Sequence, residues 1–400
     1  MWIESTIALR FLREGRAQTV LILTGIGVGV SVIVFIVALI RGLQDNIVDR
    51  TLGTQAHIKV EAPDETNRLA PLPAGTTRLV LETPRAQRLR SINNWQQVMD
   101  VLDQLPGVKA VSPVVSGPAF AWRGNAVESV ALVGMDPVRY QRIIPLAEDI
   151  VAGQLRVGAG DAVIGRMLAE KLGLRVGDKF RLVAGAGREA QLNIAGVFEL
   201  GVRELDQRYV YLDLKQTQSL LDLPGGVTVI DLTVRDIFAA QVASRRIAAL
   251  TGLKAESWLD TNAQLVNALR SQSMSTAMIS FFVALSVAFG IASVLSISVV
   301  QRTREIGILR AMGARQLQML KVFLVQGAVL GFTGSALGAF AGYGLVWVFN
   351  TFGPKLFYIP VAPTLVPLAM AIATLTGTIA AAVPARRAAR LDPVVAIRHV

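Results

Sequence analysis

Charged side chains that could do chemistry gather between Gln301 and Met319, where the sequence reads QRTREIGILRAMGARQLQM. The basic residues there are Arg302, Arg304, Arg310 and Arg315, with Lys321 just beyond, and the single acid is Glu305. Guanidinium and carboxylate groups form charge-assisted hydrogen bonds with partner proteins. The segment therefore offers docking chemistry, and it holds no pairing of nucleophile and base that would indicate catalysis.

Other chemistries find little support. Cysteine is absent, which removes thiol and Cys-zinc chemistry, and we expect His57 and His399 to be surface residues too far apart to share a site. Gly25, Gly27 and Gly29 resemble a dinucleotide fingerprint weakly, but no strand precedes them, so helix packing is the better interpretation. The sequence has no phosphate-binding loop of the form GxxxxGK followed by Ser or Thr. We expect a non-catalytic subunit whose energy comes from a separate ATPase.

Beyond the segment from Gln301 to Met319, which we call the docking segment, the sequence contains four long runs that lack any Asp, Glu, Lys or Arg. They are Ala17 to Ile40, Ser271 to Gln301, Val322 to Pro354 and Leu356 to Ala385. Each exceeds the roughly 20 residues that cross a bilayer core. We predict four transmembrane helices, at residues 17–40, 271–300, 321–350 and 362–385. Because no ionisable group interrupts these runs, coupling to protons or ions is disfavoured.

The orientation follows from the distribution of basic residues. Residues 1–16, 301–321 and 386–400 hold twelve Lys and Arg against four acids, a net of +8 out of the total of +11. By the positive-inside rule the amino-terminal segment 1–16, the loop 301–320 and the tail 386–400 are cytoplasmic. Residues 41–270 and the loop 351–361 are then outside. The first apolar run is too long for a cleaved signal peptide, so we predict an uncleaved anchor. The basic residues flank spans, which disfavours nucleic-acid binding.

The exported segment 41–270 alternates strand and helix patterns and predicts an α+β domain of two modules, the second at about 159–235. Residues 62–91 show no sustained periodicity and predict a long loop or insert. A helix is expected from Ala162 to Leu172. After a strand at Lys254 to Trp258, a helix with its cap at Asp260 is expected to run unbroken into the second span. The fold class is thus a membrane protein with four transmembrane α-helices and a large α+β domain between the first and second.

On a helical wheel the charges of the docking segment do not share one face, and neither do its apolar residues. A helix lying on lipid headgroups would separate the two kinds. Charges on several sides suit a short helix held by another protein, with Gly313 as its stop. A purely topological anchor is the alternative, although it leaves the glycines and Glu305 unexplained. The residues assigned to docking are Arg302, Thr303, Arg304, Glu305, Ile306, Gly307, Ile308, Leu309, Arg310, Met312 and Gly313.

The stretch Thr303 to Ala314, TREIGILRAMGA, resembles the coupling helix of the ABC permease superfamily that includes the macrolide exporters and the FtsX-like cell-division permeases. The tail Pro384 to Pro393 is also typical of it. Within the superfamily the chain looks most similar to the Lol-type lipoprotein-releasing permeases. The segments that carry this likeness are LRFLR at 9–13, LG at 52–53 with HI at 57–58, GMDP at 134–137, LGLRVGD at 172–178 and GVFE at 196–199.

The resemblance implies a bacterial inner-membrane permease with a MacB-like periplasmic domain that works by mechanotransmission. Two permease subunits, identical or different, would sit on an ATPase dimer that uses ATP and magnesium, while this chain itself binds no cofactor or metal. Membrane lipids and a periplasmic carrier or adaptor would be further partners. The lipid part of a lipoprotein or other amphipathic cargo would lie against the outer parts of the first two spans. The residues assigned there are Val34, Phe35, Met274, Met278, Phe281 and Phe282.

Other interpretations remain open from the sequence. The methionines and phenylalanines of the second span could be an adaptable apolar wall for a ligand, or simply lipid-facing or packing surface. The cargo could instead be small molecules or peptides of a tripartite export system. A third alternative is a transmembrane regulator that activates a periplasmic cell-wall hydrolase without transport.

Overall fold

The computed structural model describes residues 2–63, 89–185, 187–354 and 357–390. The chain divides into two compact units. One comprises Met1–Val48 together with Asn267–Val400, and the other is Asp49–Val266.

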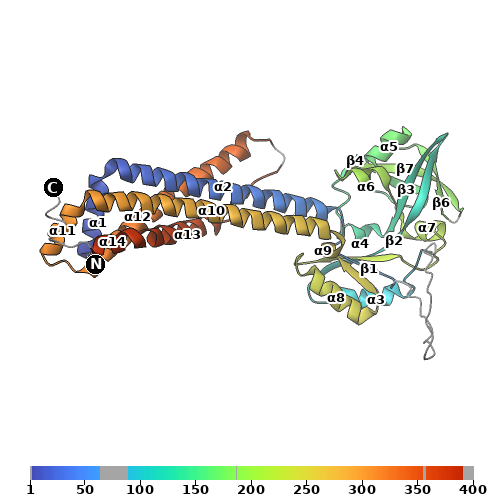
Figure 1. The fold of residues 1–400 in the computed structure, drawn as a ribbon. Coiled ribbons are helices and arrows are strands. Elements are labelled where there is room, and N and C mark those ends of the chain that lie inside the picture. Colours follow the sequence, from blue (N-terminus) through green and yellow to red (C-terminus); the bar gives the residue numbers. More distant parts are fainter. Residues whose placement is uncertain (1, 64–88, 186, 355–356, 391–400) are drawn as a thin grey trace, which may run out of the picture. The chain divides into compact units, whose positions relative to one another are not determined.

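The first unit is helical. Its elements are α1 (Trp2–Glu14), α2 (Arg16–Gly53), α10 (Ala263–Gln301), α11 (Thr303–Ala311), α12 (Gln316–Phe352), α13 (Leu365–Ala380) and α14 (Ala382–Ala389). Helices long and apolar enough to cross a membrane are α2, α10, α12 and the pair α13 and α14, taken together as Leu365–Ala389. Figure 1 shows α1, α11 and α14 gathered at one end of this unit.

Small residues let α2 and α12 approach closely. An added Cβ at Gly338 would lie 2.5 Å from the carbonyl oxygen of Gly27, and one at Gly334 would lie 2.8 Å from Ile26. At Gly342 the nearest atoms belong to Val34, at 3.0 Å. Such small-residue faces are the usual means by which membrane helices pack, because lipid gives no hydrophobic drive for their association. Packing thus explains Gly334, Gly338 and Gly342, whereas an added Cβ at Gly25 or Gly344 would have nothing within 4 Å.

The helices differ from the predicted spans at their ends. α2 continues to Gly53, beyond the apolar run, and α10 begins at Ala263. The fourth helix is interrupted at Ala381, between α13 and α14, because the ring of Pro384 cannot fit an uninterrupted helix with the carbonyl four residues earlier.

The second unit is a mixed α/β domain. Its strands are β1 (Ile58–Glu61), β2 (Val108–Arg123), β3 (Ala126–Met135), β4 (Ile150–Gly153), β5 (Asp161–Gly165), β6 (Lys179–Ala184), β7 (Glu189–Phe198), β8 (Tyr209–Asp213), β9 (Val229–Val234) and β10 (Lys254–Ser257). Its helices are α3 (Trp95–Asp103), α4 (Pro137–Tyr140), α5 (Arg166–Leu172), α6 (Arg203–Arg208), α7 (Leu214–Leu220), α8 (Ala240–Thr251) and α9 (Trp258–Thr261).

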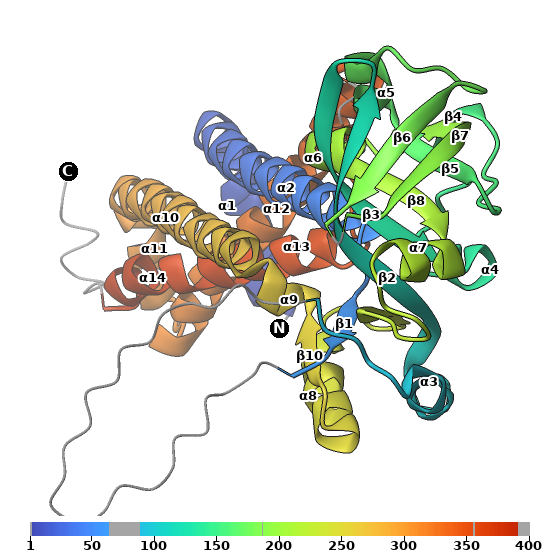
Figure 2. The ribbon, with the colours of Figure 1, turned by 90° about the vertical axis from the view of Figure 1, so that its right-hand side faces the viewer.

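All ten described strands join in a single sheet, of order β10-β1-β9-β2-β3-β8-β5-β7-β4, with β6 paired to both β2 and β7. The long strand β2 makes this continuity: its first half pairs with β9, and its second half with β3 and β6. The two predicted modules are therefore parts of one sheet and not separate sheets. Figure 2 shows α8 beside β10, α3 beside the end of β2, and α5 and α6 near the opposite part of the sheet.

A core cluster of this domain includes Tyr211, which is fully buried. Its ring centroid lies 5.2 Å from that of Phe198 and 5.8 Å from that of Tyr140, in the edge-on and tilted arrangements that aromatic rings favour. Burial raises the pKa of the Tyr211 hydroxyl strongly. This cluster fixes β7, β8 and α4 against each other.

Two predicted helices were wrong in detail. Residues Asp161–Gly165 form strand β5, paired with β7 and β8, so the expected helix from Ala162 starts only at Arg166. The helix expected to run unbroken from Asp260 stops after one turn, α9, and α10 begins anew at Ala263. Ser257 caps α9 by exchanging hydrogen bonds with Asp260. Most of the predicted insert, residues 64–88, lies outside the described residues.

Candidate functional site

Helix α11 carries most of the residues predicted for docking, and the chain itself holds one side of it. Ile306 is fully buried in a cluster with Phe11 of α1, Phe323 of α12 and Ala385 of α14. The rings of Phe11 and Phe323 lie 6.3 Å apart. Gly307 is buried as well. The helix is thus seated on three neighbouring helices.

Arg302, at the junction of α10 and α11, fastens this region to α1. Its Nη1 donates to Glu14 Oε2 at 3.1 Å, and its Nη2 donates to the carbonyl oxygen of Phe11 at 3.0 Å. The guanidinium carbon lies 4.6 Å from the centroid of the Phe11 ring, within the range of a cation–π contact. The Arg302 side chain is only 12% exposed. Its contacts are structural in this chain.

The far end of α11 is fixed by Arg310 and Gly313. Arg310 Nη1 donates to the carbonyl oxygen of Ala389, at the end of α14, at 2.8 Å. Gly313 has φ +100°, its N–H donates to Arg310 O, and the N–H of Ala314 donates to Leu309 O. This pair of bonds is a Schellman motif, which requires the left-handed conformation that glycine adopts without strain. Gly313 thus ends the helix where the sequence predicted, because the turn itself requires a residue in the left-handed conformation.

The opposite side of α11 is open. Arg304, Glu305, Ile308, Ala311 and Met312 are exposed, Ile308 by 44% and Met312 by 78%. Residues 305, 308, 311 and 312 follow Arg304 by one, four, seven and eight positions. At 3.6 residues per turn, these spacings place all five on one face of the helix. The charges of this segment do not share one face, as predicted: Arg304 and Glu305 lie on the open face, whereas Arg302 and Arg310 turn to the chain's own α1 and α14.

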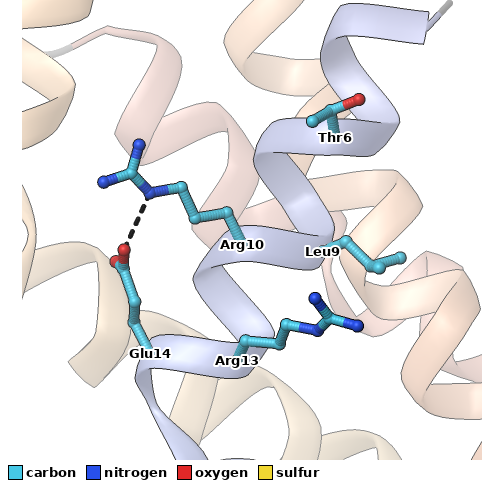
Figure 3. Close-up of a pocket in the computed structure, with 5 residues that line it drawn as sticks. All are labelled: Thr6, Leu9, Arg10, Arg13 and Glu14. Carbon is cyan, nitrogen blue, oxygen red and sulfur yellow. Dashed lines mark hydrogen bonds and ion pairs between the residues drawn. The ribbon is translucent and has the colours of Figure 1, made fainter.

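A hollow on α1 adds to this exposed surface. It has a volume of about 470 Å³ and is lined by Thr6, Leu9, Arg10, Arg13 and Glu14. Figure 3 shows Arg10 donating to Glu14, at 2.8 Å, on one side of the helix, with Leu9 and Arg13 lying together on the other. The negative charge of Glu305 contributes to the raised pKa of Arg10, after the larger effect of Glu14. The three-residue spacing of Ala8 and Phe11, both buried, is the sequence signal for the packed face of α1.

The residues assigned to a lipid-like cargo separate into two groups. Val34 is fully buried against α12, and Phe35 is half-buried with its ring 6.4 Å from that of Phe349. Both pack inside the helical unit, and their assignment to cargo stays a prediction. On α10, in contrast, the remaining four form an exposed apolar surface. Their exposures are 70% for Met274, 56% for Met278, 63% for Phe281 and 59% for Phe282.

His57 does not behave as a surface residue. It is half-buried, and its Nδ1 lies 3.1 Å from the backbone nitrogen of Val234 and 3.2 Å from the carbonyl oxygen. Burial lowers its pKa. Its role is to tie β1 to β9, while His399 lies outside the described residues.

The motifs in the α/β domain that suggested a family are structural. Asp136 caps α4 by accepting from the N–H groups of Val138 and Arg139, with Pro137 at the first helical position. Gly173 ends α5 in the left-handed conformation. Asp178 Oδ2 accepts from the N–H of Arg175 in the turn that follows. These residues shape turns and are not a chemical site.

A bundle of apolar helices, an α/β domain lying in sequence between α2 and α10, and a charged helix open on one face define an integral membrane protein with a large extramembrane domain. The comparisons give its family. The MacB-like periplasmic core domain matches residues 19–250, and the FtsX-like permease C-terminal region matches residues 277–393. The chain belongs to this family of ABC transporter permeases, in the inner membrane with a periplasmic domain.

Relatives of two kinds are similar over the chain. The lipoprotein-releasing system transmembrane protein LolC of Xylella fastidiosa (strain Temecula1) is 26% identical over 98% of both proteins. LolC of Neisseria meningitidis serogroup B is 23% identical over 86% of this chain and 82% of that protein. The macrolide export ATP-binding/permease protein MacB of Azoarcus sp. is 27% identical over 99% of this chain, which spans 59% of that longer protein.

Proposed function

We propose that this permease converts ATP hydrolysis by a separate ATPase subunit into the release of a lipoprotein, or another amphipathic cargo, from the outer leaflet of the inner membrane. The observation that carries the proposal is the open face of α11, on a helix whose other side is seated in the chain. The similarity to LolC over nearly its full length supports the cargo. In this proposal the termini and α11 face the cytoplasm, two permease subunits act together, and a periplasmic carrier receives the cargo.

The seating of α11 makes it suited to transmit force. A push on Arg304, Glu305 and Ile308 meets a helix that is pinned at both ends, by Arg302 and by Arg310. Because Ile306 is packed against α1, α12 and α14, these helices must move with it. Arg302 follows directly on α10, which is 39 residues long and carries the motion away from the ATPase.

The ATPase would contact two adjoining surfaces. The exposed apolar side chains of Ile308 and Met312 provide area, while Arg304 and Glu305 provide orientation through charge. Arg10 and Arg13, on the rim of the α1 hollow, would take an acidic segment of the ATPase. The cargo's acyl chains would lie on the exposed methionines and phenylalanines of α10, which can adapt to different chains.

Charge reversal on the open face tests the coupling. Met312→Glu leaves the buried side of α11 untouched, and Glu305→Lys removes in addition only the long ion pair, 3.7 Å, between Glu305 Oε2 and Arg302 Nη1. Both should reduce ATP-driven cargo release at least about tenfold, since each disrupts an interface contact. Gly307→Trp would not test docking, because Gly307 is buried. The measurement is release of a lipoprotein from proteoliposomes that hold the permease with its copurifying ATPase. Asp100→Lys, on an exposed position of α3, is the matched control. Normal release by both variants would contradict the proposal.

A second function is favoured by the match to MacB-like periplasmic domains and by the similarity to MacB. In that case the open face of α11 would couple ATP hydrolysis to the export of small molecules or peptides. Copurification separates the two functions: a soluble lipoprotein carrier supports release, whereas an adaptor with an outer-membrane channel supports export.

A further inference from the structure

A cavity of about 460 Å³ lies in the α/β domain, whose residues are far in sequence from the open face of α11. Strands β1, β2, β3, β8 and β9, helices α4 and α6, and the last turn of α2 line it, and it is partly open to the surface. Its charged lining consists of Lys59, Glu61, Glu204 and Asp231. Acids therefore outnumber bases three to one.

Asp231 is the unusual residue of this lining. It sits in the middle of β9, opposite Lys59 of β1 and Ser112 of β2 in the strand register. It is only 7% exposed, and its Oδ1 has no hydrogen-bond partner within the described part of the chain. Buried carboxylates are normally paired or hydrogen-bonded, because an unpaired one loses its hydration without compensation. Because Oδ1 itself is covered, a molecule in the cavity would reach the carboxylate through the 7% of the residue that stays exposed.

Lys59 does not compensate for the burial of Asp231. Burial raises the pKa of Asp231 to about 6, against the opposing effect of the Lys59 charge, and Glu61 adds to the increase. A second buried group in the lining, Gln55 Nε2, also has no partner among the described residues. The chain itself thus leaves the polar wall of this cavity incompletely satisfied.

We propose that this cavity binds a small organic ammonium ion, with the ammonium group donating to Asp231 and an apolar body against the cavity wall. The excess of acids sets the sign of the ligand's charge. Tyr140 and Tyr209, also in the lining, are side chains of a type that attracts organic cations. Val114 and Val229 supply apolar wall. The volume is in the usual range for a small-molecule site. A metal ion fits less well, since the described residues include no cluster of three or more His, Asp or Glu suited to one.

Titration calorimetry on the full chain in lipid nanodiscs tests the site, with benzylammonium chloride as the probe and benzyl alcohol as its uncharged counterpart. Phosphate buffer at neutral pH is required, because Tris is itself an organic ammonium ion. We expect saturable binding of benzylammonium only. Asp231→Asn should weaken it at least about tenfold by removing the charged acceptor, while Asp100→Asn, an exposed acid of α3, should leave it unchanged.

A variant with the opposite expectation guards against misfolding as an explanation. Lys59→Gln removes the cation that competes for Asp231, so binding should tighten by roughly threefold or more. Misfolding could not produce that gain. Equal binding of benzyl alcohol, binding unaffected by both Asp231→Asn and Lys59→Gln, no saturable binding at millimolar concentration, or displacement of the probe by calcium alone would each overturn the proposal.

Discussion

At the scale of single residues, Asp231 gives a pH-dependent prediction. Its pKa in the folded chain, about 6, lies above the ordinary value of 3.8. Between these values the folded chain keeps a proton that the unfolded chain has released, so stability falls as the pH rises through this window. The full loss, above pH 6, is about 3 kcal/mol at most. Asp231→Asn remains neutral, and its stability relative to the parent should increase between pH 4.5 and 7.5.

The measurement is the thermal midpoint of parent and variant at both pH values, in phosphate or acetate and without amines. Taking the difference between the two proteins removes the contributions of the other acids. Parallel midpoints across the range would show that Asp231 is not buried as described.

Residue chemistry in the docking segment was only partly predictable. The sequence indicates that Arg302, Arg304, Glu305 and Arg310 are charged, and the wheel gives their angles around α11. It does not show that the side chains of Arg302 and Arg310 reach Phe11 and Ala389, which are nearly 300 and 80 residues distant. Long-range packing therefore decided which charges are free to dock. Gly313 was predictable because a helix stop is a local property.

At the scale of elements, we predict that α1 supports helix α11 through its contacts with Arg302. Arg302→Met removes the bonds to Glu14 and to the Phe11 carbonyl, together with the cation–π contact. The loss should be about 2 kcal/mol, enough to release α1 for part of the time. Trypsin should then cut at Arg10 and Arg13 several times faster than in the parent. Arg304→Met, at an exposed position outside these contacts, keeps both trypsin sites and serves as control, and unchanged cleavage after Arg302→Met would contradict this role of α1.

The pairing of α2 with α12 gives a second prediction at this scale. Gly338→Ala places a Cβ 2.5 Å from the carbonyl oxygen of Gly27, a backbone atom that cannot rotate away. The helices must separate, at a cost of about 1 to 3 kcal/mol. Gly344→Ala, on the same helix with nothing within 4 Å of the new Cβ, should be neutral. Thermal midpoints in one detergent compare the two, and equal midpoints would contradict this packing.

The existence of helices was easier to predict than their breaks. Long charge-free runs indicate helices that cross membranes without ambiguity. The interruption at Ala381 depends on one proline, and the start of α10 on the caps around Ser257. The sequence at Ala162 to Gly165 is short and apolar, which suits a buried strand as well as a helix. Its pairing with β7 and β8 determines the result.

At the scale of the whole molecule, the order of domains could be predicted because it rests on sums over many residues, such as charge and apolar length. The continuity of the sheet could not. It depends on β2, whose sixteen residues pair with β9 at one end and with β3 and β6 at the other, and no local pattern records such partners. The cavity at Asp231 was missed for the same reason, since β1 and β9 are brought together from 170 residues apart.

Orientation in the membrane is the remaining property at this scale, and the sequence makes it easy to measure because the chain contains no cysteine. A single introduced cysteine is then the only site for a maleimide reagent. Met312→Cys lies on the open face of α11 and Asp100→Cys on exposed α3. If the basic segments are cytoplasmic, as the positive-inside rule requires, a membrane-impermeant maleimide should label Asp100→Cys in intact spheroplasts and Met312→Cys only after lysis. The reverse pattern would place the coupling surface outside, where no ATP is available, and would remove the basis of the proposed coupling.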